Sequence, residues 1–352
     1  MANFICFAST EFIRTAVTAG VYGNVGNRRQ QDLWSILRDV IAVKPGDSIF
    51  FYETGGKRFH GVFEATSEPF FCDDNLFQDP RDSFPFRFSF RRRIDFPKPV
   101  PDFEFIHMVD RKIAWSLGAL QKDPTGPFRS IVNVSDQEKD ALIQLFRKYN
   151  TDVVPIQTTA PIVTRAIMPR TEAINIITAN NRPTVETAID LTVLPTVGSG
   201  ESLLCQYEYA LQAYIAYILS RRTSEAISLM GDYRESLTEV PLSAAEPRRI
   251  DVLCTYQVPG ACGPYFYILV ELKARATISA HDLSQILGYI RIFTQKKGVE
   301  FGDVGGAFVA PAFSADAITY AQQRLQIEVE KPLRLIEYNL TQSGAVTFTP
   351  VM

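Results

Sequence analysis

The sequence has little histidine and little cysteine. Its 352 residues include 3 histidines and 5 cysteines, and the cysteines are scattered without any C-x-x-C pair. This pattern argues against a disulfide framework and against a structural zinc site. The histidines lie far apart in the sequence, so no site built mainly on histidine is suggested. Any metal is therefore expected to be held by carboxylates.

The sequence also lacks a long apolar run and a strong charge of either sign. No uncharged apolar run reaches the roughly 18 residues that a membrane span needs, and the opening MANFICFASTEFIR has no basic segment followed by an apolar one. We therefore expect a cytoplasmic protein without a membrane partner. The net charge of -3 excludes a generally basic chain, although nucleic-acid binding depends on where the charges lie. A chain of this length predicts about two domains.

Residues 1–150 read mainly as short strands. Apolar or alternating segments predict strands at 3–8, 48–52, 59–66 and 84–94, and an amphipathic pattern predicts a helix at 30–41. The last of these strands alternates phenylalanines with arginines, which predicts one buried face and one basic face. We expect a compact, mostly β domain of barrel type.

Residues 151–200 change in character. They contain five prolines and many threonines, and they close on Gly198-Ser199-Gly200. Their content of isoleucine and valine is too high for a disordered linker. We interpret them as a connector that contains one or two short strands.

Residues 201–345 alternate helices and strands. Helices are predicted at 201–219, 279–294 and 314–325, and strands at 249–256, 265–272, 306–310 and 333–338. This order indicates an α/β sandwich with a mixed sheet, so the whole chain is expected to be of the α+β or α/β class.

Two neighbouring strands of this second domain each carry an acidic residue. These are Asp251 and Glu271, and Lys273 follows Glu271 by two positions, which places both on one face of a strand. Carboxylates can hold magnesium through hard oxygen ligands, and a nearby ammonium can orient the attacking water. The pattern predicts phosphodiester hydrolysis. The alternative is a surface ion pair between Glu271 and Lys273 on an edge strand, although Asp251 on the neighbouring strand argues against it.

These residues resemble the D…E-x-K…Q-x-x-x-Y set of the PD-(D/E)xK nucleases, and most closely the NucS-type endonuclease domain. The resemblance covers about residues 201–340, with Gln285 and Tyr289 as the last two members of the set. It implies that Asp251 and Glu271 bind Mg²⁺ or Mn²⁺ and that Lys273 positions the nucleophilic water. It also implies that Gln285 and Tyr289 support the site and touch the substrate phosphate. An ordinary helix pair would explain the last two equally well.

The family's first-helix glutamate is best matched by Glu208, with Glu201 as a competitor two turns earlier. The proline of the superfamily name is absent, because Arg249-Ile250 precedes Asp251. The loop between the two acidic strands is also longer than the usual turn of the family. Neither departure removes a catalytic group.

The first domain resembles the EVE domains, which are PUA-like relatives of YTH domains. The resemblance rests on three segments, residues 45–52, 60–65 and 84–88, and covers about residues 1–150. It implies a small pocket that holds a flipped and often modified base. By position, Tyr22, Asn24 and Trp34 are the candidates for this pocket. For Trp34, packing in the core beside other apolar residues of an amphipathic helix is the stronger interpretation.

Together, the two resemblances imply an EVE domain fused to a nuclease domain, as in a modification-dependent restriction endonuclease. We expect a Mg²⁺-dependent endodeoxyribonuclease that acts on DNA as a homodimer, with Arg91, Arg92 and Arg93 as candidate contacts to the nucleic-acid backbone. Taken alone, such a charge run is more often a solvated surface. Two alternatives remain open: a repair endonuclease for mismatched or branched DNA, and a non-catalytic nucleic-acid-binding protein.

Overall fold

The computed structural model of the chain describes residues 1–26, 28–79, 82–107, 129–159, 162, 164–179, 182–198, 203–242, 248–257, 265–325 and 333–351. Glu201 and Cys262 lie outside these ranges. The chain splits into two compact units, the first ending at Asp190 and the second beginning at Leu191. No helix of the described residues is both long and apolar enough to cross a membrane.

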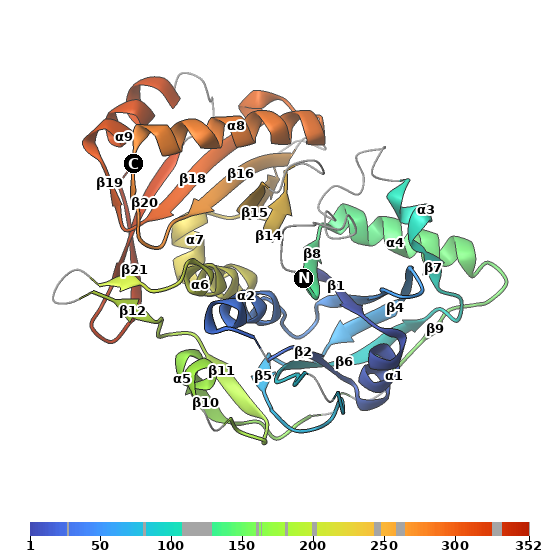
Figure 1. Cartoon of the computed structure of the whole chain (residues 1–352). Coiled ribbons are helices and arrows are strands. Elements are labelled where there is room, and N and C mark those ends of the chain that lie inside the picture. Colours follow the sequence, from blue (N-terminus) through green and yellow to red (C-terminus); the bar gives the residue numbers. More distant parts are fainter. Residues whose placement is uncertain are drawn as a thin grey trace. The chain divides into compact units, whose positions relative to one another are not determined.

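The first unit is built on one branched, mixed sheet (Figure 1). Its strands are β1 (Asn3–Ala8), β2 (Val21–Asn24), β3 (Ser48–Glu53), β4 (Arg58–Ala65), β5 (Phe70–Phe71), β6 (Phe86–Asp95), β7 (Val100–Pro101), β8 (Ile131–Val134), β9 (Ile156–Gln157), β10 (Met168–Glu172) and β11 (Thr187–Asp190). The strand order is β10-β11-β5-β6-β4-β3-β1-β8, and β2 and β9 also pair with β6. Among the described residues no pairing joins β8 to β10, so this order stays open where a barrel was expected.

Five helices accompany this sheet in the described part of the first unit. They are α1 (Thr10–Ala19), α2 (Gln30–Ile41), α3 (Asp102–Ile106), α4 (Asp136–Tyr149) and α5 (Ala173–Thr178). The helix predicted at 30–41 is confirmed to the residue, whereas α1 was not predicted. Leu142 and Phe146 of α4 share a hydrophobic core with Ile5 of β1 and Phe50 of β3, so α4 covers the β1–β3 side of the sheet.

Strand β6 differs from the prediction of one buried and one basic face. Phe86, Arg87, Phe88, Ser89 and Phe90 are all buried, so both faces of this part of the strand are covered. The prediction that this part of the strand has a basic, exposed face is therefore wrong. Alternation of residue types along a strand shows only which side chains share a face of the sheet. In β6, other parts of the chain also cover the face that carries Arg87 and Ser89.

The segment expected as a connector takes part in the first sheet. Strand β9 pairs with β6, and the parallel pair β10–β11 joins the sheet through β5. The described strands up to Asp190 therefore belong to the sheet of the N-terminal strands, and the segment from Leu191 belongs to the second unit.

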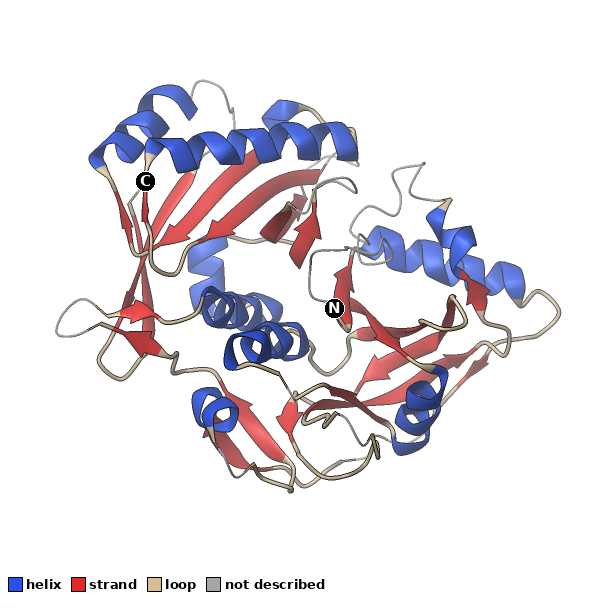
Figure 2. Ribbon diagram, viewed as in Figure 1, coloured by secondary structure: helices blue, strands red, loops and turns tan. Residues whose placement is uncertain are grey.

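The second unit contains a six-stranded mixed sheet with helices on both faces (Figures 1 and 2). Its strands are β14 (Glu235–Pro241), β15 (Arg249–Gln257), β16 (Tyr265–Leu272), β18 (Val304–Ala310), β20 (Arg334–Leu340) and β21 (Val346–Pro350), in this order. Pairing is parallel between β16, β18 and β20 and antiparallel elsewhere. The predicted mixed sheet is confirmed.

Helix α8 (Ala280–Lys297) covers one face of this sheet, and α6 (Glu208–Arg221) with α7 (Ser224–Met230) lies on the other (Figure 1). The remaining elements are β12 (Thr196–Val197), β13 (Leu204–Cys205), β17 (Thr277–Ile278), the 3₁₀ turn Phe301–Asp303, β19 (Ala312–Phe313), and α9 (Ala315–Tyr320) with its π-helical continuation Ala321–Leu325. Helix α6 begins at Glu208, later than the predicted start at 201, and α7, β14 and β21 were not predicted.

Candidate functional site

Asp251 lies on β15, the second strand of the six-stranded sheet, and both of its carboxylate oxygens accept hydrogen bonds. The backbone N–H of Leu272, on the adjacent strand β16, donates to Oδ2 at 2.7 Å. The side-chain Nε2 of Gln212, on α6, donates to Oδ1 at 2.7 Å. Strand β16 and helix α6 together therefore fix the plane of this carboxylate.

Glu271 and Lys273 lie at the C-terminal end of β16. The Nζ of Lys273 is 2.8 Å from Oε1 of Glu271 and 4.0 Å from Oε2 of Glu208, at the first turn of α6. The backbone N–H of Lys273 donates to the carbonyl of Val309, which holds this residue in line with β18. The predicted residues Asp251, Glu271, Lys273 and Glu208 are thus brought to one region of the second unit.

The electrostatics of this region reflect several carboxylates close together. Burial, followed by the charge of Glu271, raises the pKa of Asp251 well above its usual range. Burial also raises the pKa of Glu271 and of Glu208, and Lys273 partly opposes both shifts. Burial alone would lower the pKa of Lys273, but the Glu271 carboxylate raises it overall. A divalent cation would relieve this mutual repulsion.

One further carboxylate, that of Glu239, was missed by the sequence analysis. Its neighbours on β14 pair with Val252 and Ile250, so Glu239 stands opposite Asp251 in the ladder. Its φ of 54° is left-handed, a conformation that is rare for a residue with a side chain. Its negative charge also raises the pKa of Glu208 and Glu271. No local sequence motif marks it, because strand register alone places it here.

The two helix residues of the predicted set differ in their placement. Burial, followed by the Glu271 carboxylate, raises the pKa of Tyr289, so this residue lies within electrostatic reach of the site. Gln285 is exposed, and its Nε2 lies 3.4 Å from Nε2 of His281 on the same helix. This side-chain contact therefore lies within α8.

The donor set fits a hard divalent cation that keeps part of its water shell. Within the described residues, no three acidic, histidine or cysteine side chains converge closely enough to form a complete metal cage. Magnesium in proteins is usually held by one or two carboxylates and several waters, so a complete cage is not required. Asp251 and Glu271 would hold such an ion.

The residues proposed for a base pocket are buried in the first unit. Tyr22, Asn24 and Trp34 are 1%, 1% and 0% exposed. The hydroxyl of Tyr22 donates to the carbonyl of Ser130, and Oδ1 of Asn24 accepts from the hydroxyl of the same serine. A base could reach these side chains only if the surrounding core opened.

A cavity of about 670 Å³ lies elsewhere in the first unit, lined by residues between Asp73 and Phe84 together with Gly26, Arg28 and Arg182. The rings of Phe77 and Phe84 form part of its wall. This cavity had no signal in the sequence, since its wall comes from three segments that are distant along the chain.

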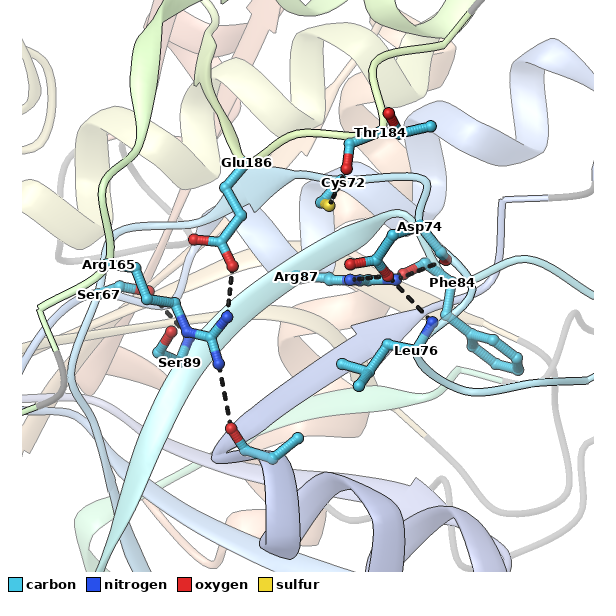
Figure 3. Close-up of polar contacts among 11 residues, drawn as sticks. Ser67, Cys72, Asp74, Leu76, Phe84, Arg87, Ser89, Arg165, Thr184 and Glu186 are labelled. Atoms are coloured by element: carbon cyan, nitrogen blue, oxygen red, sulfur yellow. Dashed lines mark hydrogen bonds and ion pairs between the residues drawn. The ribbon is translucent and has the colours of Figure 1, made fainter.

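Arg87 fixes the segment that forms the cavity wall (Figure 3). This side chain is 2% exposed, and its guanidinium pairs with Oδ1 of Asp74 at 2.6 Å and donates to the carbonyl of Phe84 at 2.7 Å. It also lies 5.4 Å from the centre of the Phe77 ring. Arg87 therefore stabilises the loop that carries both aromatic rings.

The three arginines that were expected to contact phosphate lie further along β6, the strand that carries Arg87. Arg91 pairs with Glu64 at 3.1 Å and Arg92 with Asp95 at 2.8 Å, whereas Arg93 is exposed. Arg91 and Arg92 would have to exchange these partners to bind a phosphate. Arg93 is the most accessible of the three.

Comparison with known proteins gives weak likenesses. No family model and no curated protein matches the chain. The human THYN1 protein, solved with DNA containing 5-methylcytosine, is 16% identical with a TM-score of 0.30, over 42% of this chain and 98% of that one. A repair endonuclease from Pyrococcus abyssi is 19% identical with a TM-score of 0.24, over 34% of this chain and 43% of that one.

The YTH domain of the Zygosaccharomyces rouxii MRB1 protein, solved with N6-methyladenosine RNA, is 12% identical with a TM-score of 0.26, over 46% of this chain and 92% of that one. With TM-scores below 0.5, these likenesses do not establish a fold or an activity.

Proposed function

We propose that the second unit is a metal-dependent nuclease that hydrolyses phosphodiester bonds in DNA, using Mg²⁺ or Mn²⁺. The observation that carries this proposal is the grouping of Asp251 and Glu271 on adjacent strands with Lys273 at 2.8 Å from Glu271. A purely structural ion pair needs no second buried carboxylate beside it. Burying such carboxylates together opposes folding, so a functional reason for them is expected.

Each residue of the site would have a distinct role in the proposed reaction. A bound divalent ion would lower the pKa of a water molecule and neutralise the charge that develops on the phosphate. Asp251 and Glu271 would hold that ion, and Glu208 would add negative charge from α6. The ammonium of Lys273 would orient the attacking water, while Tyr289 and Gln285 would contact the substrate phosphate.

Substitution of the two proposed metal ligands tests this function. Asp251→Asn and Glu271→Gln should each abolish Mg²⁺-dependent cleavage of a plasmid, while a surface variant such as Asp232→Asn should cleave as the wild type does. The side chain of Asp232 is 86% exposed and lies on the loop before β14, which makes it a suitable control. Full cleavage by Asp251→Asn would refute the catalytic assignment.

The first unit would select the DNA by binding a flipped, modified base. The resemblance of residues 1–150 to EVE domains suggests this role, and the cavity beside Phe77 and Phe84 has room for a base. Tyr22, Asn24 and Trp34 would then support the fold around the pocket rather than line it. Arg93 would contact the backbone nearby, with Arg91 and Arg92.

A cleavage panel separates this proposal from its alternatives. Unmodified, methylated, hydroxymethylated and mismatched duplexes would be compared at one Mg²⁺ concentration. Preference for a modified duplex would support a modification-dependent restriction enzyme, and preference for mismatches would support a repair endonuclease. No cleavage of any duplex, with binding intact, would leave a non-catalytic DNA-binding protein.

Cutting both strands would require two active sites or two sequential encounters with the DNA, and we propose that a homodimer supplies the two sites. Light scattering at micromolar concentration tests it. A monomer with full double-strand activity would overturn this part of the proposal.

A further inference from the structure

We propose that Gln212 is a positioning residue that holds Asp251 ready for the metal. This inference rests on the proposed function and concerns the same site. Gln212 is 2% exposed, and its Nε2 donates a 2.7 Å hydrogen bond to Oδ1 of Asp251. A carboxylate is an acceptor only, so the amide nitrogen of Gln212 must face it.

Helix geometry explains why Gln212 reaches the site. It follows Glu208 by four residues on α6, and residues four apart lie on the same face of a helix. One face of α6 therefore presents a carboxylate and an amide to the same region of the sheet. Glu208 adds charge there, whereas Gln212 adds a neutral donor.

The neutral donor matters because acidic side chains lie on both strands that flank Asp251. Glu239 stands opposite Asp251 on β14, and Glu271 lies on the adjacent strand β16. A cationic side chain in place of Gln212 would also stabilise the carboxylate of Asp251, but it would compete with a metal ion for the carboxylate oxygens. An amide holds the oxygen without that competition, and the N–H of Leu272 does the same for the other oxygen at 2.7 Å.

Glu271 is held in a different way. Its Oε1 is bound at 2.8 Å by the ammonium of Lys273, a cation that a metal ion would have to displace or share. The two proposed ligands therefore differ in their hydrogen-bond donors. Neutral N–H groups orient Asp251 before a metal binds, whereas the ammonium of Lys273 orients Glu271. Loss of Gln212 should then weaken metal binding more than it weakens the chemical step at saturating metal.

The test measures Mn²⁺ binding to the full chain by electron paramagnetic resonance of the free ion, in the absence of DNA. Gln212→Met removes the donor at similar length, and Gln212→Asn keeps the amide but withdraws it by one methylene. We expect both to raise the Kd for Mn²⁺ by about 10-fold or more, the range typical of groups that orient metal ligands.

The matched control is Tyr214→Phe, on the same helix, which removes a 2.9 Å hydrogen bond to Glu225. It should lower stability slightly and leave the Kd for Mn²⁺ within about twofold of wild type. A second readout is the Mn²⁺ dependence of cleavage. The Gln212 variants should need more Mn²⁺ for half-maximal rate, while kcat at saturating Mn²⁺ falls by a smaller factor.

Two outcomes overturn the inference in distinguishable ways. If the Gln212 variants remain folded and bind Mn²⁺ with the wild-type Kd, Gln212 has no positioning role and the proposed function is untouched. If wild-type protein shows no Mn²⁺ binding that Asp251→Asn removes, the proposed function fails and the inference fails with it.

Discussion

Glu239 on β14 faces Asp251 on β15, and its negative charge raises the pKa of Asp251. The contribution follows those of burial and of Glu271 in size. The site therefore contains an acidic neighbour that makes Asp251 harder to ionise. Such a neighbour shifts the working pH of the site without belonging to the residues that the sequence motif marks.

Replacing Glu239 should change the pH dependence of cleavage. Glu239→Gln removes a negative charge, lowers the pKa of Asp251 and Glu271, and lets both ionise at lower pH. We expect the acid limb of the pH–rate profile to move to lower pH by up to about one unit. Glu235→Gln, on the same strand, serves as the control. An acid limb that stays in place would contradict this prediction.

Asp251→Asn should stabilise the metal-free protein while abolishing cleavage. The pKa of Asp251 is raised in the folded state, so ionisation above the usual pKa of about 4 opposes folding. In chelator at pH 7.5 the variant should melt at a higher Tm than wild type, and the difference should shrink as the pH falls toward 4. Differential scanning calorimetry over this range measures it. A lower Tm at pH 7.5 would argue against mutual repulsion in the site.

Lys273→Met should separate the chemical step from metal binding. The ammonium is proposed to orient the water, so its loss should reduce the single-turnover rate by about 10²- to 10⁴-fold. Because Lys273 also occupies Oε1 of Glu271, its loss should leave Mn²⁺ binding unchanged or tighter. Rapid-quench cleavage and a Mn²⁺ titration measure the two effects. A rate within tenfold of wild type would remove Lys273 from the mechanism.

Glu53→Gln should lower the free energy of unfolding of the first unit at neutral pH but not at acidic pH. The hydrogen bond from Arg58 lowers the pKa of Glu53 to about 2 despite its burial, with Thr10 and His60 adding to the shift. A lowered pKa stabilises the fold above the unfolded-state value of about 4.5, and this stability is lost as the pH falls toward 2. The lost stabilisation at pH 7 should be about 2 to 3 kcal/mol.

Urea unfolding of the Glu53 variant at several pH values measures this difference. Wild type and variant should converge between pH 5 and pH 2, the interval set by the usual and shifted pKa values of Glu53. Glu64→Gln, on the neighbouring strand β4 with a 21% exposed side chain, is the control. A difference that persists unchanged at low pH would point to lost packing rather than lost charge.

Trp34→Ala should mainly lower the stability of the first unit, whereas Phe77→Ala should mainly change its DNA binding. Trp34 is fully buried, so its truncation should cost about 3 to 5 kcal/mol of stability. Phe77 is half-buried on the cavity wall, so Phe77→Ala should mainly weaken discrimination between modified and unmodified duplexes. Chemical denaturation and competition binding measure the two. If Phe77→Ala retained full discrimination, the base would bind elsewhere.

Local patterns in the sequence predicted much of the secondary structure. Helix α2 was predicted at its observed bounds because its apolar residues recur at helical spacing, a property of adjacent residues alone. Helix α1 was missed, since its threonines and valine favour strands on average and its Ser9 cap is a single residue. Asp251, Glu271 and Lys273 were found because a charged group at the end of an apolar strand is visible in the sequence.

From the sequence alone came the prediction of about two domains, the strands that carry Asp251 and Glu271, and the expectation that carboxylates would hold any metal, since histidine and cysteine are few. Other features of the site depend on how distant elements pack together. Register across β14 and β15 brought Glu239 to Asp251, and packing of α6 on the sheet brought Gln212. Packing of the segment that contains Asp74 and Phe84 against β6 buried Arg87. The contacts of Asp251 with Glu239 and Gln212 join separate secondary-structure elements, and local spacing carries no information about such pairs.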